Sequence, residues 1–129
     1  MLSRFESVSL NECLYQLSEA IDQDDFEKLY RGFHTLKGAS GYIGAGRIHL
    51  ACYFMEEAHR EKDKLKLQQA YPLLIEISIE FKRYARKFIA DYRSEPYTET
   101  ANTVKIELAK GYTLQICGST SIYYCLYQE

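Results

Sequence analysis

The sequence has no apolar run approaching the ~20 residues of a membrane-spanning helix, which argues against an integral membrane protein. Residues 1–6 lack the long apolar core of a secretory signal peptide. The formal net charge is only −2, so the chain has no overall attraction for nucleic acid or for an anionic membrane. We therefore expect a cytoplasmic protein, also nuclear if the source is a eukaryote, that binds neither nucleic acid nor membrane.

The four cysteines lack the spacing of a metal site, because none forms a CxxC pair and none has a histidine at ligand spacing. Cys13 and Cys52 fall on apolar faces of expected helices, and we interpret both as free buried thiols. The chain also has no ATP-binding motif. These absences predict no metal or nucleotide cofactor of its own, and they exclude a complete kinase.

Apolar residues recur at helical spacing in four segments, near residues 10–21, 24–43, 48–62 and 65–92. Ser9 and Glu12 have the spacing of a capping box, which predicts that the first helix begins there. Pro72 interrupts the last segment, where it either kinks one long helix or begins a separate one. Amphipathic helices joined by short links are typical of a four-helix bundle. We predict an all-α, antiparallel four-helix bundle over residues 1–94.

The sequence changes character after Tyr92, and we do not expect the tail, residues 95–129, to be a separate folded domain. Pro96 ends the helical pattern. Residues 104–108 alternate between apolar and polar side chains as a strand does, and residues 110–111, Lys-Gly, have the composition of a turn. These features leave three structures open for this C-terminal extension: a β-hairpin, a loosely packed arm or a disordered segment.

His34 occupies an unusual position in the second expected helix, within the sequence HTLKGAS at residues 34–40. At about 100° per residue it lies about 120° from the centre of the apolar stripe, on the solvent side. Arg31 and Lys37 neighbour it, and Gly38 and Gly41 leave positions without side chains nearby. A glycine inside a helix costs roughly 1 kcal/mol relative to alanine, so its presence indicates a need for open space.

An exposed imidazole among basic residues and glycines has the chemistry of a phosphoryl carrier. Neutral imidazole is a competent nucleophile near neutral pH. The ammonium group of Lys37 would stabilise charge on the oxygens of a transferring phosphoryl group. A hydrogen bond from the other ring nitrogen to an acceptor would fix the reactive tautomer of the imidazole. The sequence does not identify the residue that accepts this hydrogen bond. His49 and His59 are too far apart in the sequence to share one site, and we interpret both as surface residues.

The segment resembles the signature of histidine-containing phosphotransfer (HPt) domains. In that signature a histidine precedes an apolar residue, a lysine, a glycine and two small residues, and an apolar-glycine-small sequence follows before the next helix. This chain has HTLKGAS at residues 34–40, Ile-Gly-Ala at residues 43–45, and then Ile48. The resemblance covers about residues 5–94, and the tail has no counterpart in it.

The resemblance implies a phosphorelay intermediate, a carrier rather than an autonomous enzyme. His34 is expected to accept a phosphoryl group from an aspartate of a receiver domain, such as that of a hybrid histidine kinase, and to pass it to an aspartate of a response regulator. Lys37 would assist electrostatically, and Gly38 would give the receiver access. The Mg2+ ion would belong to the receiver. We expect a monomer.

Two alternatives stay open. The first is a non-catalytic four-helix adaptor that binds receiver domains without phosphotransfer, although the presence of both His34 and Lys37 argues against it. The second is a piece of a larger kinase, and here the closeness of Met1 to the first helix favours a free-standing protein.

The chain departs from the family pattern at Gly46, where some members carry a glutamine that hydrogen bonds toward the histidine. Arg47 is then the candidate to replace part of that interaction. A receiver must bind transiently, so we expect a small interface with an apolar centre. The candidate side chains for it are Leu2, Phe5, Val8 and Tyr15.

Overall fold

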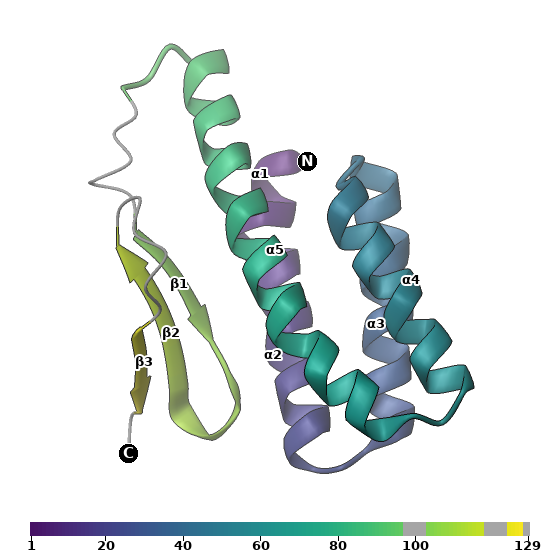
Figure 1. Cartoon of the computed structure of the whole chain (residues 1–129). Helices are drawn as coiled ribbons and strands as arrows, with labels where there is room; N and C mark the ends of the chain where they lie inside the picture. The colour runs from purple at the N-terminus through teal and green to yellow at the C-terminus, as the bar shows by residue number, and fades with distance from the viewer. Residues whose placement is uncertain (97–102, 118–123, 128–129) are drawn as a thin grey trace.

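The structure of the chain, a computed structural model, describes residues 1–96, 103–117 and 124–127 (Figure 1). The N-terminal helical run consists of α1 (Leu2–Arg4), a π-helical turn η1 (Phe5–Ser9) and α2 (Leu10–Asp22). It is followed by α3 (Phe26–Ile43), α4 (Gly46–Arg60) and α5 (Lys64–Tyr92). The predicted antiparallel four-helix bundle is thus confirmed, and a small region containing strands follows it.

Side-chain caps and a glycine set the boundaries of α3 and α5. Asp25 caps α3 by accepting a hydrogen bond from the backbone N–H of Lys28, and Asp63 caps α5 by accepting one from Lys66. At its other end, α3 stops at Gly44, which has a φ of +83° and so adopts a left-handed conformation that favours glycine. α3 therefore runs without interruption through His34.

One expectation about helix boundaries is wrong, and of the two alternatives for Pro72 the continuous helix is correct. Ser9 has helical dihedral angles and its side chain makes no capping hydrogen bond, because the helical run already begins at Leu2. Pro72 lies inside the continuous α5 and does not begin a separate helix. Tertiary packing of an apolar helix face outweighs the single hydrogen bond that a proline removes.

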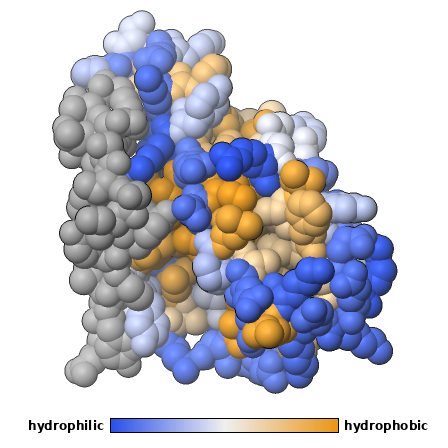
Figure 2. All heavy atoms as spheres, viewed as in Figure 1, coloured by the Kyte–Doolittle hydropathy of each residue, from blue (hydrophilic) through white to orange (hydrophobic). Residues whose placement is uncertain are grey.

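The helices pack around one apolar core, and α3 lies between α2 and α4 (Figure 1). Figure 2 shows apolar atoms gathered over the middle of one face, with hydrophilic atoms around them. None of the helices in the described ranges combines the length and apolar composition needed to cross a bilayer. The large side chains buried almost completely include Leu14, Leu17, Phe33, Leu36, Ile48, Met55, Leu67 and Leu74.

Cys13 and Cys52 are free thiols, as predicted. Cys52 is fully buried in α4, whereas Cys13 is only half-buried in α2. Burial raises the pKa of the Cys52 thiol to about 12. Cys52 is therefore an inert part of the core.

A buried ion cluster ties the N-terminal helical run to α5. Lys82 is fully buried, and its ammonium group donates to both the carbonyl and the carboxylate of Glu6. Arg86 donates to the same carboxylate, with 2.8 Å between its Nε and Oε1 of Glu6. Burial lowers the pKa of Lys82, and the negative charge of Glu6 opposes that shift.

The described part of the tail forms an antiparallel sheet in the order β1-β2-β3, with β1 (Thr103–Glu107), β2 (Tyr112–Cys117) and β3 (Tyr124–Tyr127). Of the three structures left open, the hairpin is correct: β1 and β2 pair through a short turn in which Lys110 and Gly111 have positive φ. Val104 and Ile106 are buried against the helices, while Lys105 and Glu107 are exposed. The sheet thus extends the core of the bundle.

Two contacts hold the end of the hairpin to α2. The backbone N–H of Ala109 donates to Oγ of Ser18, with 2.9 Å between the two atoms. Nζ of Lys110 lies 2.7 Å from a carboxylate oxygen of Asp22. The hairpin is consequently fixed beside α2, on the side of the bundle away from α3 and α4 (Figure 1).

Candidate functional site

His34 lies in the middle of α3, on the side that the helical periodicity predicts. One face of α3 buries Leu29, Phe33, Leu36 and Ser40 in the core. The side chain of His34 projects from the shoulder of that face and is 69% exposed. Its imidazole is therefore accessible to a partner molecule while its backbone is held by a well-packed helix.

The hydrogen-bond partner of the imidazole is Glu56, which comes from the neighbouring helix α4. Oε1 of Glu56 lies 3.1 Å from Nδ1 of His34, and Oε2 of the same carboxylate lies 2.9 Å from Nζ of Lys37. The side chain of Glu56 is only 10% exposed. One buried carboxylate thus holds the histidine and the lysine in place together.

Glu56 is ionised in this arrangement. Burial opposes its ionisation, but the hydrogen bonds from Lys37 and His34 outweigh burial and hold the pKa of Glu56 below its ordinary value. An ionised carboxylate only accepts hydrogen bonds, so Nδ1 of His34 carries the proton that it donates. The lone pair of the neutral imidazole is then on Nε2. This is the reactive tautomer for a nucleophilic histidine.

Lys37 remains charged, because its hydrogen bond to Glu56 raises the pKa of its ammonium group. The same group lies 5.2 Å from the ring centroid of Tyr53, at the distance of a cation–π contact. The side chain is 28% exposed. Lys37 therefore places a fixed positive charge beside the imidazole and at the solvent boundary.

The two glycines near His34 differ in what surrounds them. A Cβ atom at Gly38 would meet no atom within 4 Å, so the space over this residue is open. A Cβ at Gly41 would lie only 3.0 Å from Nδ1 of His49. His49 also donates a hydrogen bond to the carbonyl of Lys37, at 2.8 Å. The expectation of free space holds at Gly38 and is wrong at Gly41, which is where His49 packs.

Aromatic rings border the imidazole on one side. Tyr30, one turn before His34 on α3, stacks on the imidazole with 6.0 Å between ring centroids. The ring of Tyr30 also stacks on that of His59, with 4.6 Å between the centroids. His59 is therefore a half-buried packing residue rather than a surface histidine.

The exposed apolar surface next to the site lies on α4. Tyr53, which contacts Lys37, is followed by Phe54, and Leu50 lies one turn earlier on the same helix. All three side chains are about half exposed. We name them the α4 patch. Among the residues predicted for this role, Phe5 is wrong, because it is buried in the core.

Arg47 does not reach the imidazole. Its guanidinium group lies 2.6 Å from a carboxylate oxygen of Glu80 on α5. The expectation that Arg47 hydrogen bonds toward His34 in place of a glutamine at position 46 is wrong, since Glu56 makes that hydrogen bond. One signal for Glu56 was present in the sequence: a carboxylate four residues after Cys52, on the edge of the apolar stripe of its helix.

The described residues contain no cluster of three or more histidine, cysteine or acidic side chains that would hold a metal ion. A family model described as the Hpt domain matches residues 3–84, which is more than half of the chain. The match contains His34, Lys37, Gly38 and Glu56, and it ends before the sheet. No curated protein and no solved structure shows significant similarity to the chain.

Proposed function

Because the chain belongs to the Hpt domain family, and so takes part in histidine phosphotransfer, we propose that His34 is its phosphoryl-carrying residue. His34 accepts the phosphoryl group from an aspartate of one receiver domain and passes it to an aspartate of a response regulator. The single observation that carries this proposal is the hydrogen bond from Nδ1 of His34 to the ionised Glu56, which leaves the lone pair on Nε2.

The proposed step is a direct displacement. Nε2 of His34 attacks the phosphorus of an aspartyl phosphate, and the N–P bond forms while the bond from phosphorus to the aspartate oxygen breaks. The aspartate leaves as a carboxylate. No proton moves, since Nδ1 keeps its own, and the phosphorylated ring carries a positive charge. The Glu56 carboxylate, 3.1 Å from Nδ1, stabilises that charge.

Lys37 acts on the transferred group from its position beside the imidazole. Its ammonium group, held by Glu56, provides positive charge for the equatorial phosphoryl oxygens. The Mg2+ ion for the reaction is brought by the receiver, and this chain brings no cofactor. The return step to the response regulator is the same displacement in reverse, so one site serves both partners.

The receiver approaches over Gly38 and the α4 patch. The open space above Gly38 admits another backbone close to Nε2 of His34. The α4 patch adjoins Lys37 through Tyr53, and its half-exposed apolar side chains form the centre of a small interface. Such an interface suits a partner that must leave after each transfer.

The experiment is to incubate the chain with a set of radiolabelled phospho-receivers and Mg2+, and to follow the label. We expect label on the chain that is labile in acid and stable in base, and mass spectrometry should place it on His34. Label on another residue would contradict the assignment of His34. Tight binding of a phospho-receiver without any transfer would instead favour the adaptor.

Glu56 offers a graded test of the charge that it provides. We expect Glu56→Gln to slow phosphotransfer about tenfold and Glu56→Leu about 100-fold. The amide of glutamine still accepts the Nδ1–H hydrogen bond but brings no charge, whereas leucine removes the hydrogen bond as well. Single-turnover transfer from one phospho-receiver measures both rates. A Glu56→Gln rate equal to that of the wild type would show that the charge on Glu56 does not matter.

Two substitutions at Gly38 test the stability of the helix and access to the histidine separately. Because a Cβ at this position meets nothing, we expect Gly38→Ala to raise the free energy of unfolding by about 0.5–1 kcal/mol. Gly38→Gln should fold equally well but slow transfer about tenfold or more, since its side chain fills the approach path. Urea unfolding and single-turnover transfer measure the two effects. A Gly38→Gln variant that transfers at the wild-type rate would contradict approach over this residue.

A further inference from the structure

In the described part of the chain, the β1 edge of the C-terminal sheet has no neighbouring strand. The backbone N–H of Leu108 donates to the carbonyl of Tyr112, which fixes the alternation of hydrogen bonds between β1 and β2. Residues 104 and 106 therefore bond to β2, and the N–H and C=O groups of Lys105 and Glu107 point away from it. Among the described residues, no backbone group pairs with Lys105 or Glu107 on that side.

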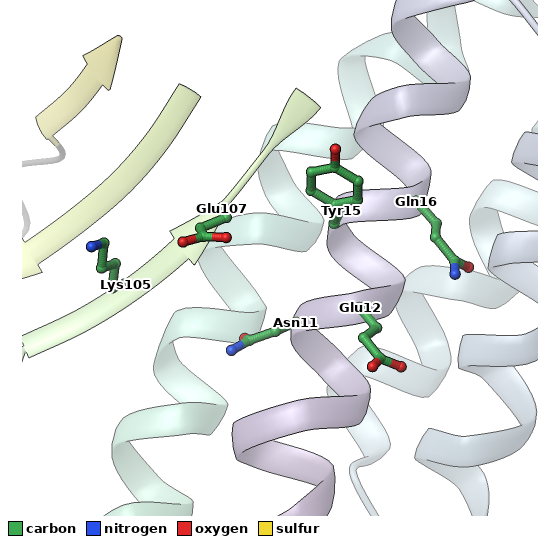
Figure 3. A pocket seen from close by; sticks show the side chains of 6 residues that line it. All are labelled: Asn11, Glu12, Tyr15, Gln16, Lys105 and Glu107. Carbon is green, nitrogen blue, oxygen red and sulfur yellow. The ribbon is translucent and has the colours of Figure 1, made fainter. Parts of the chain in front are cut away.

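A groove of about 420 Å3 lies along this edge, between β1 and α2 (Figure 3). Lys105 and Glu107, the two residues with unpaired backbone groups, form its strand side. In Figure 3 the side chain of Asn11 extends from α2 toward β1. The residues that line the groove on the helix side are Asn11, Glu12, Tyr15 and Gln16.

The wall formed by α2 limits what enters the groove. The Ala109–Ser18 hydrogen bond and the Lys110–Asp22 ion pair hold the hairpin against α2 at one end. A strand added to β1 requires about 4.8 Å of lateral space, whereas a second sheet or a helix requires about 10 Å. An extended segment is therefore the least bulky structure that can add to this edge.

We propose that this groove binds an extended peptide segment of a partner protein, which adds to β1 as a further strand. The backbone of the segment pairs with the free groups of Lys105 and Glu107, in the manner of other strand-addition sites. Its specificity comes from charge: the residues that line the groove include Glu12 on the helix side and Glu107 on the strand side, against one basic residue, Lys105. A segment with a basic side chain matches this arrangement, and the ring of Tyr15 offers an apolar contact.

A second copy of the chain fits this edge poorly. A second copy would bring its own α2 to this edge together with its β1, because two contacts attach the hairpin to α2. The α2 helix of the second copy would then meet the α2 wall. A peptide segment has no helix attached and avoids this conflict.

The groove and the histidine lie on different sides of the bundle. β1 packs on α2 and α5, whereas His34 and Glu56 lie on α3 and α4 (Figure 1). A partner held in the groove leaves the imidazole accessible. The groove lies partly on residues outside the family match, so it is a docking site additional to the phosphotransfer site at His34 and independent of it.

The test begins with selection of heptapeptides from a random displayed library against the full chain. Their affinity is then measured by fluorescence polarisation with dye-labelled peptides. We expect selected sequences to contain a basic residue and to bind more weakly at high salt. Glu107→Lys should weaken binding at least tenfold. A selection that yields no binding peptide would overturn the proposal.

The decisive variant is Lys105→Pro, with Lys105→Thr as its matched control. Proline removes the N–H that faces the groove and no bond to β2, so an edge strand tolerates it. We expect Lys105→Pro to lose at least tenfold in peptide affinity and Lys105→Thr to keep it within twofold. Equal affinity of the selected peptides for both variants would overturn the proposal.

Amide hydrogen exchange on the wild-type chain provides a measurement that does not depend on how well a variant folds. Peptide binding should slow exchange at Lys105 and Glu107, and the amide of Ile106, already bonded to β2, should change little. Sedimentation that shows a dimer disrupted by Lys105→Pro would assign the edge to a second copy and overturn the proposal.

Discussion

A chain in which His34 is replaced by glutamine is expected to accept no phosphoryl group from any phospho-receiver. Glutamine has no nucleophilic nitrogen, so the N–P bond has nowhere to form. The side chain of His34 is 69% exposed, and we expect its replacement to change the free energy of unfolding by less than about 0.5 kcal/mol. Label on the chain and urea unfolding are measured on the same preparation, so that loss of transfer is separated from loss of fold.

The chain offers a matched control in His59. This histidine stacks on the same Tyr30 ring as His34, whereas the Glu56 carboxylate hydrogen bonds to His34 and Lys37. His59→Gln should therefore retain phosphotransfer at a rate within a few-fold of the wild type. If His34→Gln still acquires acid-labile label, or if only His59→Gln loses it, the assignment of the carrier residue is wrong.

The part of the site that lies on one helix was predictable. The exposure of His34, its nearness to Lys37 and the open position at Gly38 all follow from the rotation of about 100° per residue along α3. The apolar stripe of α3 sets which side faces the core, so a single segment determines where the imidazole points. The same local logic predicted the strand at residues 104–108 from its alternation.

The contacts between helices were not predictable in this way. Glu56 follows His34 by 22 residues and reaches it only because α3 and α4 pack side by side. The distance between α3 and α4 and their rotation relative to each other depend on the side chains of both helices. The hydrophobic pattern of one helix alone does not determine them. Gly41 shows the same limit: its own helix leaves the position empty, and His49 from α4 fills it.

The groove beside β1 illustrates the limit for the tail. Alternation indicates that a strand is present, but it does not tell which edge is left unpaired or what lies next to it. Those features depend on the pairing of β1 with β2 and on the attachment of the hairpin to α2. The attachment to α2 in particular joins residues far apart in the sequence.

The largest effect on stability is expected at Glu6. Glu6→Ala removes the carboxylate beside the fully buried ammonium group of Lys82, and an unpaired buried charge typically costs about 3–5 kcal/mol. Arg86 also loses its hydrogen bond to Glu6, and its positive charge stays near Lys82. Urea unfolding near neutral pH should show this loss of stability, with the N-terminal helical run detached from α5 at lower urea than in the wild type.

Lys82→Met is the control that distinguishes charge from packing. In this variant Glu6 keeps its hydrogen bond from Arg86, whose Nε lies 2.8 Å from the Glu6 carboxylate. Methionine fills most of the space that the lysine side chain occupied. The decrease in the free energy of unfolding should therefore be less than half of that in Glu6→Ala.

The pH dependence gives a second distinction. Burial already lowers the pKa of Lys82, and loss of Glu6 lowers it further, so the folded state of Glu6→Ala binds fewer protons than the unfolded state as the pH rises. Its stability, relative to Lys82→Met, should therefore increase from about pH 7 to about pH 9. If the difference in the free energy of unfolding between Glu6→Ala and Lys82→Met stays constant over this pH range, lost packing rather than the unpaired ammonium destabilises Glu6→Ala.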